Sequence, residues 1–122
     1  MNTLEISDMP IQVGSRLAFL PNEMVFLEAS INYTNLHLAD GQKVIVSYHL
    51  GKLQKRLQGF PCFARLNKSV IVNLQYIEGF ANDYLELREQ QFFMSRRRKK
   101  IVLAMLDEYT RQNNPVNDLV NF

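Results

Sequence analysis

The chain has 122 residues, of which 47% are hydrophobic and 21% are charged, and its formal net charge is +2. This composition is typical of one soluble globular domain that can bury a core without metals or disulfides, and it excludes a largely disordered chain. The single cysteine, Cys62, lies in the apolar run of residues 60–63, so we expect a buried structural thiol.

The two ends of the chain are predicted to lie outside this domain. Residues 1–10 show no hydrophobic periodicity and are expected to form an N-terminal extension, residues 11–111 the domain itself, and residues 112–122 a flexible tail. The first residues include acids and lack the basic start and apolar run of a secretory signal. No apolar stretch is long enough to cross a bilayer, so we expect a cytoplasmic protein without membrane insertion.

The first part of the domain has the pattern of short strands joined by turns. Predicted strands cover residues 11–13, 17–20, 24–27, 36–38 and 43–46. Pro21–Asn22 marks one turn, and Asp40–Gly41 is a strong hairpin dipeptide.

The hydrophobic period changes after Ser47. Leu50, Leu53 and Leu57 lie at helical spacing before the stop at Gly59, which predicts a helix over residues 48–58 with Ser47 as its N-cap. Later strands are predicted at residues 62–65, 70–72, 77–80, 84–88 and 91–94.

A second helix is predicted from Ser95 to about Arg111. Its expected core residues are Val102, Met105, Leu106 and Tyr109. Many short strands with only two helices predict a mainly β (β-rich α+β) fold of antiparallel sheets rather than alternating βαβ units.

The residues required for catalysis or metal binding are missing from the sequence pattern. His37 and His49 have no cysteine, histidine or carboxylate at zinc-ligand spacing, and no glycine-rich phosphate loop or nucleophile elbow is present. We therefore expect a protein that is not an enzyme and that has no cofactor or metal site.

The charges are distributed unevenly. Between Gly41 and Ile77 the sequence has no Asp or Glu, and residues 96–100 form an unbroken basic run. The basic residues of the acid-free segment are Lys43, Lys52, Lys55, Arg56, Arg65 and Lys68. The pattern predicts one basic face on the folded domain.

Four segments in the same order resemble the LytTR family of bacterial response-regulator output domains. They are residues 24–38, 46–57, 63–77 and 94–100, and the resemblance extends over about residues 11 to 106. One departure is Asn67, at a position where many family members carry His. A second departure is that we expect no receiver domain, and hence no phospho-acceptor aspartate, in this chain.

The resemblance implies a fold, a function and partners. The implied fold is elongated and built from antiparallel sheets, and its loops enter successive major grooves of DNA. The implied function is that of a sequence-specific regulator of transcription that binds double-stranded promoter DNA in a two-component system. The implied partners are a second copy of the chain on DNA, and a sensor kinase or membrane sensor protein.

The resemblance also assigns candidate DNA-binding residues. Thr34, Lys68 and Arg96 are implied to read bases. Neighbours implied to hold phosphates or to orient these three are Asn32, Arg65, Asn67, Ser69, Arg97 and Lys99. On this assignment, Arg96→Ala reduces discrimination between sites, whereas Lys99→Ala weakens binding to all DNA and lowers the salt slope by about one.

The chemistry of the residues leaves alternatives open. Arginines in the first turn of a helix oppose its macrodipole, which favours a role in binding phosphate or guanine, but charge runs are usually just solvated. Lys68 suits a phosphate better than a base, and lysines in turns often only add solubility. Asn32 and Thr34 are also ordinary turn residues.

Two other functions compete with duplex binding. One is a protein-interaction module that uses the same basic surface to bind an acidic partner. The other is binding of single-stranded RNA, for which exposed aromatic residues among basic ones are typical. The relevant aromatic residues, which we expect in the core, are Phe60, Phe63, Phe80, Phe92 and Phe93.

Overall fold

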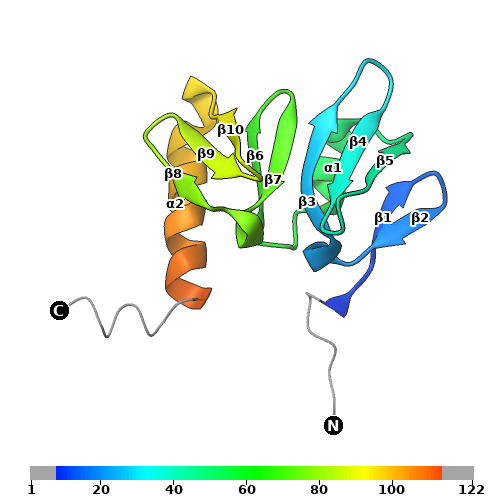
Figure 1. Cartoon of the computed structure of the whole chain (residues 1–122), viewed down its shortest axis with the longest axis horizontal. Helices are drawn as coiled ribbons and strands as arrows, with labels where there is room; N and C mark the ends of the chain where they lie inside the picture. Colours follow the sequence, from blue (N-terminus) through cyan, green and yellow to red (C-terminus); the bar gives the residue numbers. More distant parts are fainter. Residues whose placement is uncertain (1–7, 114–122) are drawn as a thin grey trace, which may run out of the picture.

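The computed structural model describes residues 8–113 and consists of antiparallel sheets and two α-helices (Figure 1). The strands are β1 (Ile11–Gly14), β2 (Leu17–Phe19), β3 (Met24–Ala29), β4 (Thr34–Leu38), β5 (Lys43–Val46), β6 (Phe63–Asn67), β7 (Val70–Asn73), β8 (Gly79–Phe80), β9 (Tyr84–Leu87) and β10 (Gln90–Phe93). The helices are α1 (Leu50–Arg56) and α2 (Arg96–Asn113). The predicted mainly β fold with two helices is confirmed.

A five-stranded sheet with the order β5-β4-β3-β7-β6 forms the centre of the molecule. Its strands alternate side chains between two faces, and each face carries its own core. Leu27, Leu36 and Ile71 pack on one face with α1 and β1, whereas Phe26 and Val72 belong to the core formed with α2 and the later strands. The sheet is therefore covered on both faces, which fixes its strand register.

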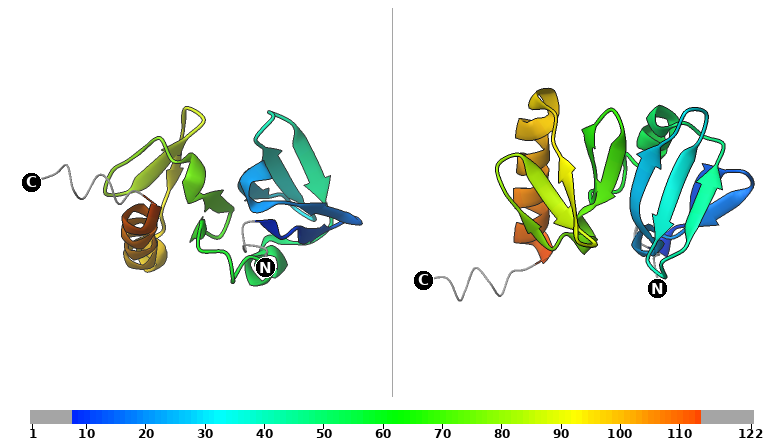
Figure 2. Two further views of the ribbon diagram at one scale, coloured as in Figure 1. Left: turned by 90° about the horizontal axis from the view of Figure 1, so that it is seen from below. Right: turned by 45° about the horizontal axis from the view of Figure 1, so that its top comes forward.

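Two smaller sheets flank this centre. The hairpin β1-β2 lies at one end of the molecule, and the three-stranded sheet β10-β9-β8 lies at the other end beside α2 (Figure 1). Figure 2 shows both helices on the same side of the strands when the molecule is seen from below. The arrangement is elongated, with the central sheet connecting two covered ends.

The first helix begins later than predicted, and its cap is a different residue. The N-cap is His49, whose Nδ1 accepts a hydrogen bond from the backbone N–H of Lys52 at 3.2 Å. Ser47 lies two residues before this cap, and its backbone N–H donates to Oγ of Ser15. The chain bends at residues 47 and 48, where it contacts the β1-β2 hairpin, and the helix begins only after this bend.

The expected helix cores are confirmed in part. Leu50, Leu53 and Leu57 are buried. In α2, Val102 and Leu106 are buried, while Met105 and Tyr109 are half-buried and pack at the edge of the cores. The helix also continues to Asn113, two residues beyond its predicted end.

Cys62 is buried, as its apolar surroundings predict. Burial raises the pKa of its thiol to about 11, so the group is protonated at neutral pH. Most of the predicted extension and nearly all of the predicted tail lie outside the described residues.

Candidate nucleic-acid interface

Three connecting segments meet at one edge of the molecule, the upper edge in Figure 1. They are the β3-β4 loop (residues 30–33), the β6-β7 turn (Lys68–Ser69) and the start of α2. Backbone hydrogen bonds connect them, because Ala29 donates to Ser69 and Ser95 donates to Leu66, both at 2.8 Å. Residues far apart in the sequence therefore form one continuous surface, which we call the loop edge.

Arg65 supports the β6-β7 turn from below. Its Nε donates to the carbonyl of Asn67 and its Nη2 to the carbonyl of Lys68, both at 2.9 Å. Its Nη1 donates to Oε1 of Gln54 on α1 at 2.8 Å. Partial burial and the nearby Arg98 lower the pKa of this guanidinium, which still remains charged at neutral pH. Arg65 thus holds the backbone of the turn and connects it to α1.

Asn67 forms a second brace. Its Oδ1 accepts a hydrogen bond from the backbone N–H of Ser69, and its Nδ2 donates to the carbonyl of Phe93 at the end of β10, both at 2.7 Å. The first bond is an Asx turn, in which the side chain replaces a backbone acceptor. The second ties the turn to the segment that leads into α2. Asn67 therefore fixes the distance between two parts of the loop edge.

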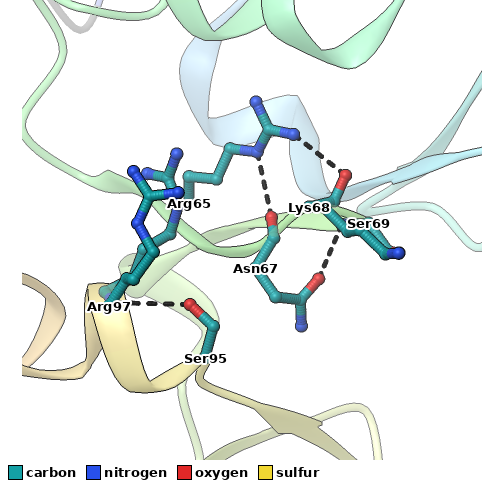
Figure 3. Close-up of a pocket in the computed structure, with 7 residues that line it drawn as sticks. Arg65, Asn67, Lys68, Ser69, Ser95 and Arg97 are labelled. Carbon is teal, nitrogen blue, oxygen red and sulfur yellow. Dashed lines mark hydrogen bonds between the residues drawn. The ribbon is translucent and has the colours of Figure 1, made fainter.

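An open pocket of about 480 Å³ lies between the β6-β7 turn and the start of α2 (Figure 3). Its lining consists of Arg65, Asn67, Lys68, Ser69, Ser95, Arg97 and Arg98. Four of these residues are cations and none is a carboxylate. A concave basic surface of this kind attracts anionic groups, phosphates above all.

The first turn of α2 presents the basic run in a defined way. Ser95 caps the helix, because its Oγ accepts a hydrogen bond from the backbone N–H of Arg98 at 3.3 Å. Arg96 and Arg97 are exposed, whereas Arg98 and Lys99 are half-buried. Lys99 turns away from the pocket and pairs with Asp83, with 3.0 Å between Nζ and Oδ1.

The exposed cations of the loop edge have no side-chain partners in the described part of the chain. Lys68, Arg96 and Arg97 make no side-chain hydrogen bond or ion pair within residues 8–113. Ser69 is also exposed. Their side chains are therefore available to a ligand. Arg65 and Asn67 fix the backbone of the turn that carries Lys68 and Ser69.

Thr34 is not exposed, although the resemblance implies that it reads a base. Its side chain is fully buried, and its hydroxyl donates to the carbonyl oxygen of Tyr48 at 2.7 Å. In this conformation Thr34 ties β4 to the segment before α1 and offers no group to a base. All four residues of its loop, 30–33, are exposed, and Ile31 is 95% exposed.

The aromatic residues also differ from the expectation. Phe63 and Phe92 are buried and Phe60 is half-buried, but Phe80 and Phe93 are exposed, by 64% and 54%. The prediction that all of them lie in the core is wrong for these two. Phe80 belongs to a strand of only two residues, and Phe93 points to the outer face of its sheet against Tyr84.

Arg98, Ser95 and Gln54 are the site residues that sequence reasoning missed. Arg98 belongs to the basic run, and this run is the feature of the sequence that could have identified it. The sequence predicts Ser95 only as the start of the helix, whereas the structure also places it in the pocket lining. The contact of Gln54 with Arg65 joins two elements and has no signal in the local sequence.

No cluster of three or more potential metal-ligating residues occurs within residues 8–113. Among the helices of this part of the chain, none is both long and apolar enough to span a membrane.

Comparison with known proteins identifies the family. The sequence profile of the LytTr DNA-binding domain matches residues 15–107. A solved structure described as the LytTr DNA-binding domain of a methyl-accepting/DNA response regulator from Bacillus cereus is similar, with a TM-score of 0.64 and 17% sequence identity. The similarity covers 80% of this chain and 94% of that one, and at this identity it supports the fold. No sequence match was found among curated proteins. The chain therefore belongs to the LytTR family of DNA-binding domains.

Proposed function

We propose that the protein is a sequence-specific regulator of transcription that binds double-stranded promoter DNA through the loop edge. The observation that carries this proposal is a group of exposed cations, Lys68, Arg96 and Arg97, that have no partner within residues 8–113. Lys68 and Arg97 line a pocket whose lining contains no carboxylate. Membership of a DNA-binding rather than a catalytic family supports it.

The side chains of the loop edge divide into two roles. Arg96 and Arg97 have planar guanidinium forks that can bind the O6 and N7 acceptors of guanine in the major groove. Lys68 is better suited to a phosphate, which anchors the protein without reading sequence. Ser69 and Asn32 can add hydrogen bonds to phosphates or base edges. Arg65 and Asn67 position these groups through the turn.

Lys99 has a smaller role in this proposal. Its ammonium is paired with Asp83, so a phosphate would have to compete with a carboxylate for it. Exposed ion pairs of this kind are weak and exchange partners readily. Lys99 therefore contributes to the basic field more than to a fixed contact.

The test is binding of the purified chain to its own promoter region, measured by fluorescence anisotropy at several salt concentrations. A scrambled duplex and the separated single strands serve as controls. The proposal predicts a preference for one duplex, with log affinity falling by about 0.9 per phosphate contact per decade of salt. Equal and weak binding to every nucleic acid would contradict it, and capture of an acidic protein partner would then become the next experiment.

The proposal includes the assembly of the regulator. Two copies of the chain are proposed to bind neighbouring half-sites, under the control of a sensor kinase or membrane sensor protein. The stoichiometry of the complex, measured by light scattering on one-half-site and two-half-site duplexes, tests the first part. One copy on both duplexes would contradict pairing.

A further inference from the structure

A second group of cations lies on α1, next to the loop edge. Lys52 and Arg56 are both exposed and lie one helical turn apart. Both side chains cover the ring of Tyr48, with Nζ of Lys52 3.9 Å and Cζ of Arg56 5.6 Å from the ring centroid. We call Lys52 and Arg56 together the α1 cation pair.

The α1 cation pair has no anionic partner in the described part of the chain. Neither residue forms an ion pair within residues 8–113, and the sequence from Gly41 to Ile77 contains no Asp or Glu. Like charges four residues apart on a helix destabilise it by about 0.2–0.5 kcal/mol. An external anion bound to both side chains would relieve this repulsion.

Three contacts fix the position of Tyr48, whose ring lies below the two cations. The carbonyl of Tyr48 accepts the hydroxyl of Thr34 at 2.7 Å, and the preceding Ser47 donates to Ser15. Gly14, at φ +96, lies so close that a Cβ there would come within 2.8 Å of Cδ1 of Tyr48. The ring therefore cannot move toward Gly14, and the two cations rest on a fixed surface.

Two hydrogen bonds connect α1 and the segment before it to the loop edge. Thr34 is the first residue after the β3-β4 loop and contacts Tyr48, while Gln54 of α1 contacts Arg65 beneath the β6-β7 turn at 2.8 Å. The segment before α1 and α1 itself are thus both hydrogen-bonded to elements of the loop edge. Figure 2 shows that α1 and α2 lie on the same side of the strands.

We propose that the α1 cation pair binds backbone phosphates of the same duplex that the loop edge reads, and so extends the anchored segment of DNA beyond the loops. This inference rests on the proposed function. Duplex DNA is favoured over an acidic protein as the occupant because α1 is hydrogen-bonded to the loop edge, so one long anion can contact both surfaces. In addition, residues four apart on a helix are separated by about 6 Å along its axis, so the two cations can contact two different phosphates of one strand.

The experiment measures how the affinity for a mixed-sequence 40-base-pair duplex depends on salt concentration, for the parent chain and two variants. The first variant is Lys52→Gln with Arg56→Gln. The matched control, Lys43→Gln with Arg88→Gln, removes the same charge from the opposite edge, where Arg88 contacts the β4-β5 turn through the carbonyl of Ala39. Thermal unfolding confirms that each variant is folded, and the single Lys52→Gln and Arg56→Gln variants serve if the double one is not.

Loss of two phosphate contacts lowers the slope of log affinity against log salt by about 1.8, which corresponds to about 60-fold weaker binding at 0.1 M salt. The control variant should keep the parent slope to within about 0.3, because it removes no contact. Equal slopes for the parent and the α1 variant would overturn the inference. If in that case Arg96→Ala with Arg97→Ala still lowers the slope, the proposed function stands without it. A parent chain that does not bind the duplex would overturn both.

Discussion

Arg65 and Arg97 line the same basic pocket, yet the structure places them in opposite situations. Arg65 uses its Nε and both terminal nitrogens in hydrogen bonds within the protein. Arg97 has no side-chain hydrogen bond or ion pair among residues 8–113 and is exposed. Within this cluster, the arginine that supports the protein's own backbone and the arginine with a free side chain are therefore distinguished by their partners rather than by their position in a motif.

The largest effect is expected when the free side chains are removed. Arg96→Ala with Arg97→Ala should weaken binding to the preferred duplex by about 2–6 kcal/mol, because each bidentate contact with a base contributes about 1–3 kcal/mol. The free energy of unfolding should change by less than about 0.5 kcal/mol, since both residues are exposed. Anisotropy and denaturant unfolding measure the two quantities. Unchanged binding would show that these arginines are not at the interface.

Removal of the Arg65 guanidinium should mainly lower the free energy of unfolding. Arg65→Met leaves an apolar stem but loses the hydrogen bonds to two carbonyls and to Gln54, and should lower the free energy of unfolding by about 1–3 kcal/mol. DNA affinity should fall because the turn is no longer held, while the salt slope stays closer to the parent value than in the Arg96/Arg97 variant. Urea unfolding and salt titration test this difference. If the variant instead lost about one unit of salt slope and kept the parent free energy of unfolding, Arg65 would be a direct phosphate contact.

Substitution of Thr34 tests the role of a single hydroxyl group, the one that donates to Tyr48. Thr34→Val keeps the shape of the side chain but loses the hydroxyl that donates to Tyr48, and should destabilise the fold by about 1 kcal/mol. Thr34→Ser keeps the hydroxyl and is the control. Discrimination between the preferred and scrambled duplexes should be the same in the parent and the Val variant. A change in base preference with Val would show that the loop rearranges on DNA and exposes this residue.

The smallest effect is expected at Lys99. Lys99→Gln should change the free energy of unfolding by less than about 0.5 kcal/mol, as is usual for exposed ion pairs, and should lower the salt slope by clearly less than one. Asp83→Asn is the informative counterpart, because it frees Lys99 and removes a negative charge near the start of α2. It should therefore tighten DNA binding slightly. Weaker binding of the Asn variant would contradict the role assigned to this ion pair.

Much of the fold could be predicted from local patterns. The alternation of residues and the hairpin signal at Asp40–Gly41 located β5 with its observed bounds, and the leucine stripe placed α1 correctly to within two residues. The cap of α1 could not be predicted. His49 caps the helix, while Ser47 contacts Ser15, 32 residues away in the sequence, and the local pattern gives no sign of this contact.

For the candidate site, the sequence predicts where the cations lie but not which of them have partners within the protein. The absence of acids over residues 41–77 and the basic run at 96–100 located the cations correctly. Their division into braces and free groups was not predictable, because it depends on contacts such as Asn67 with Phe93 and Arg65 with Gln54. Burial of Thr34 and exposure of Phe93 likewise follow from which sheet face each residue occupies, and short strands give a weak signal for this.

The central claim is that the loop edge binds duplex DNA, and a titration of isotope-labelled protein with its preferred duplex tests it most directly. Backbone amide shifts in two-dimensional NMR spectra report which residues contact the ligand. We predict that the largest shifts occur at Asn32, Lys68, Ser69, Arg96 and Arg97, with little change at residues 40–43 on the opposite edge. Shifts concentrated at residues 40–43, or spread evenly over residues 8–113, would contradict the account.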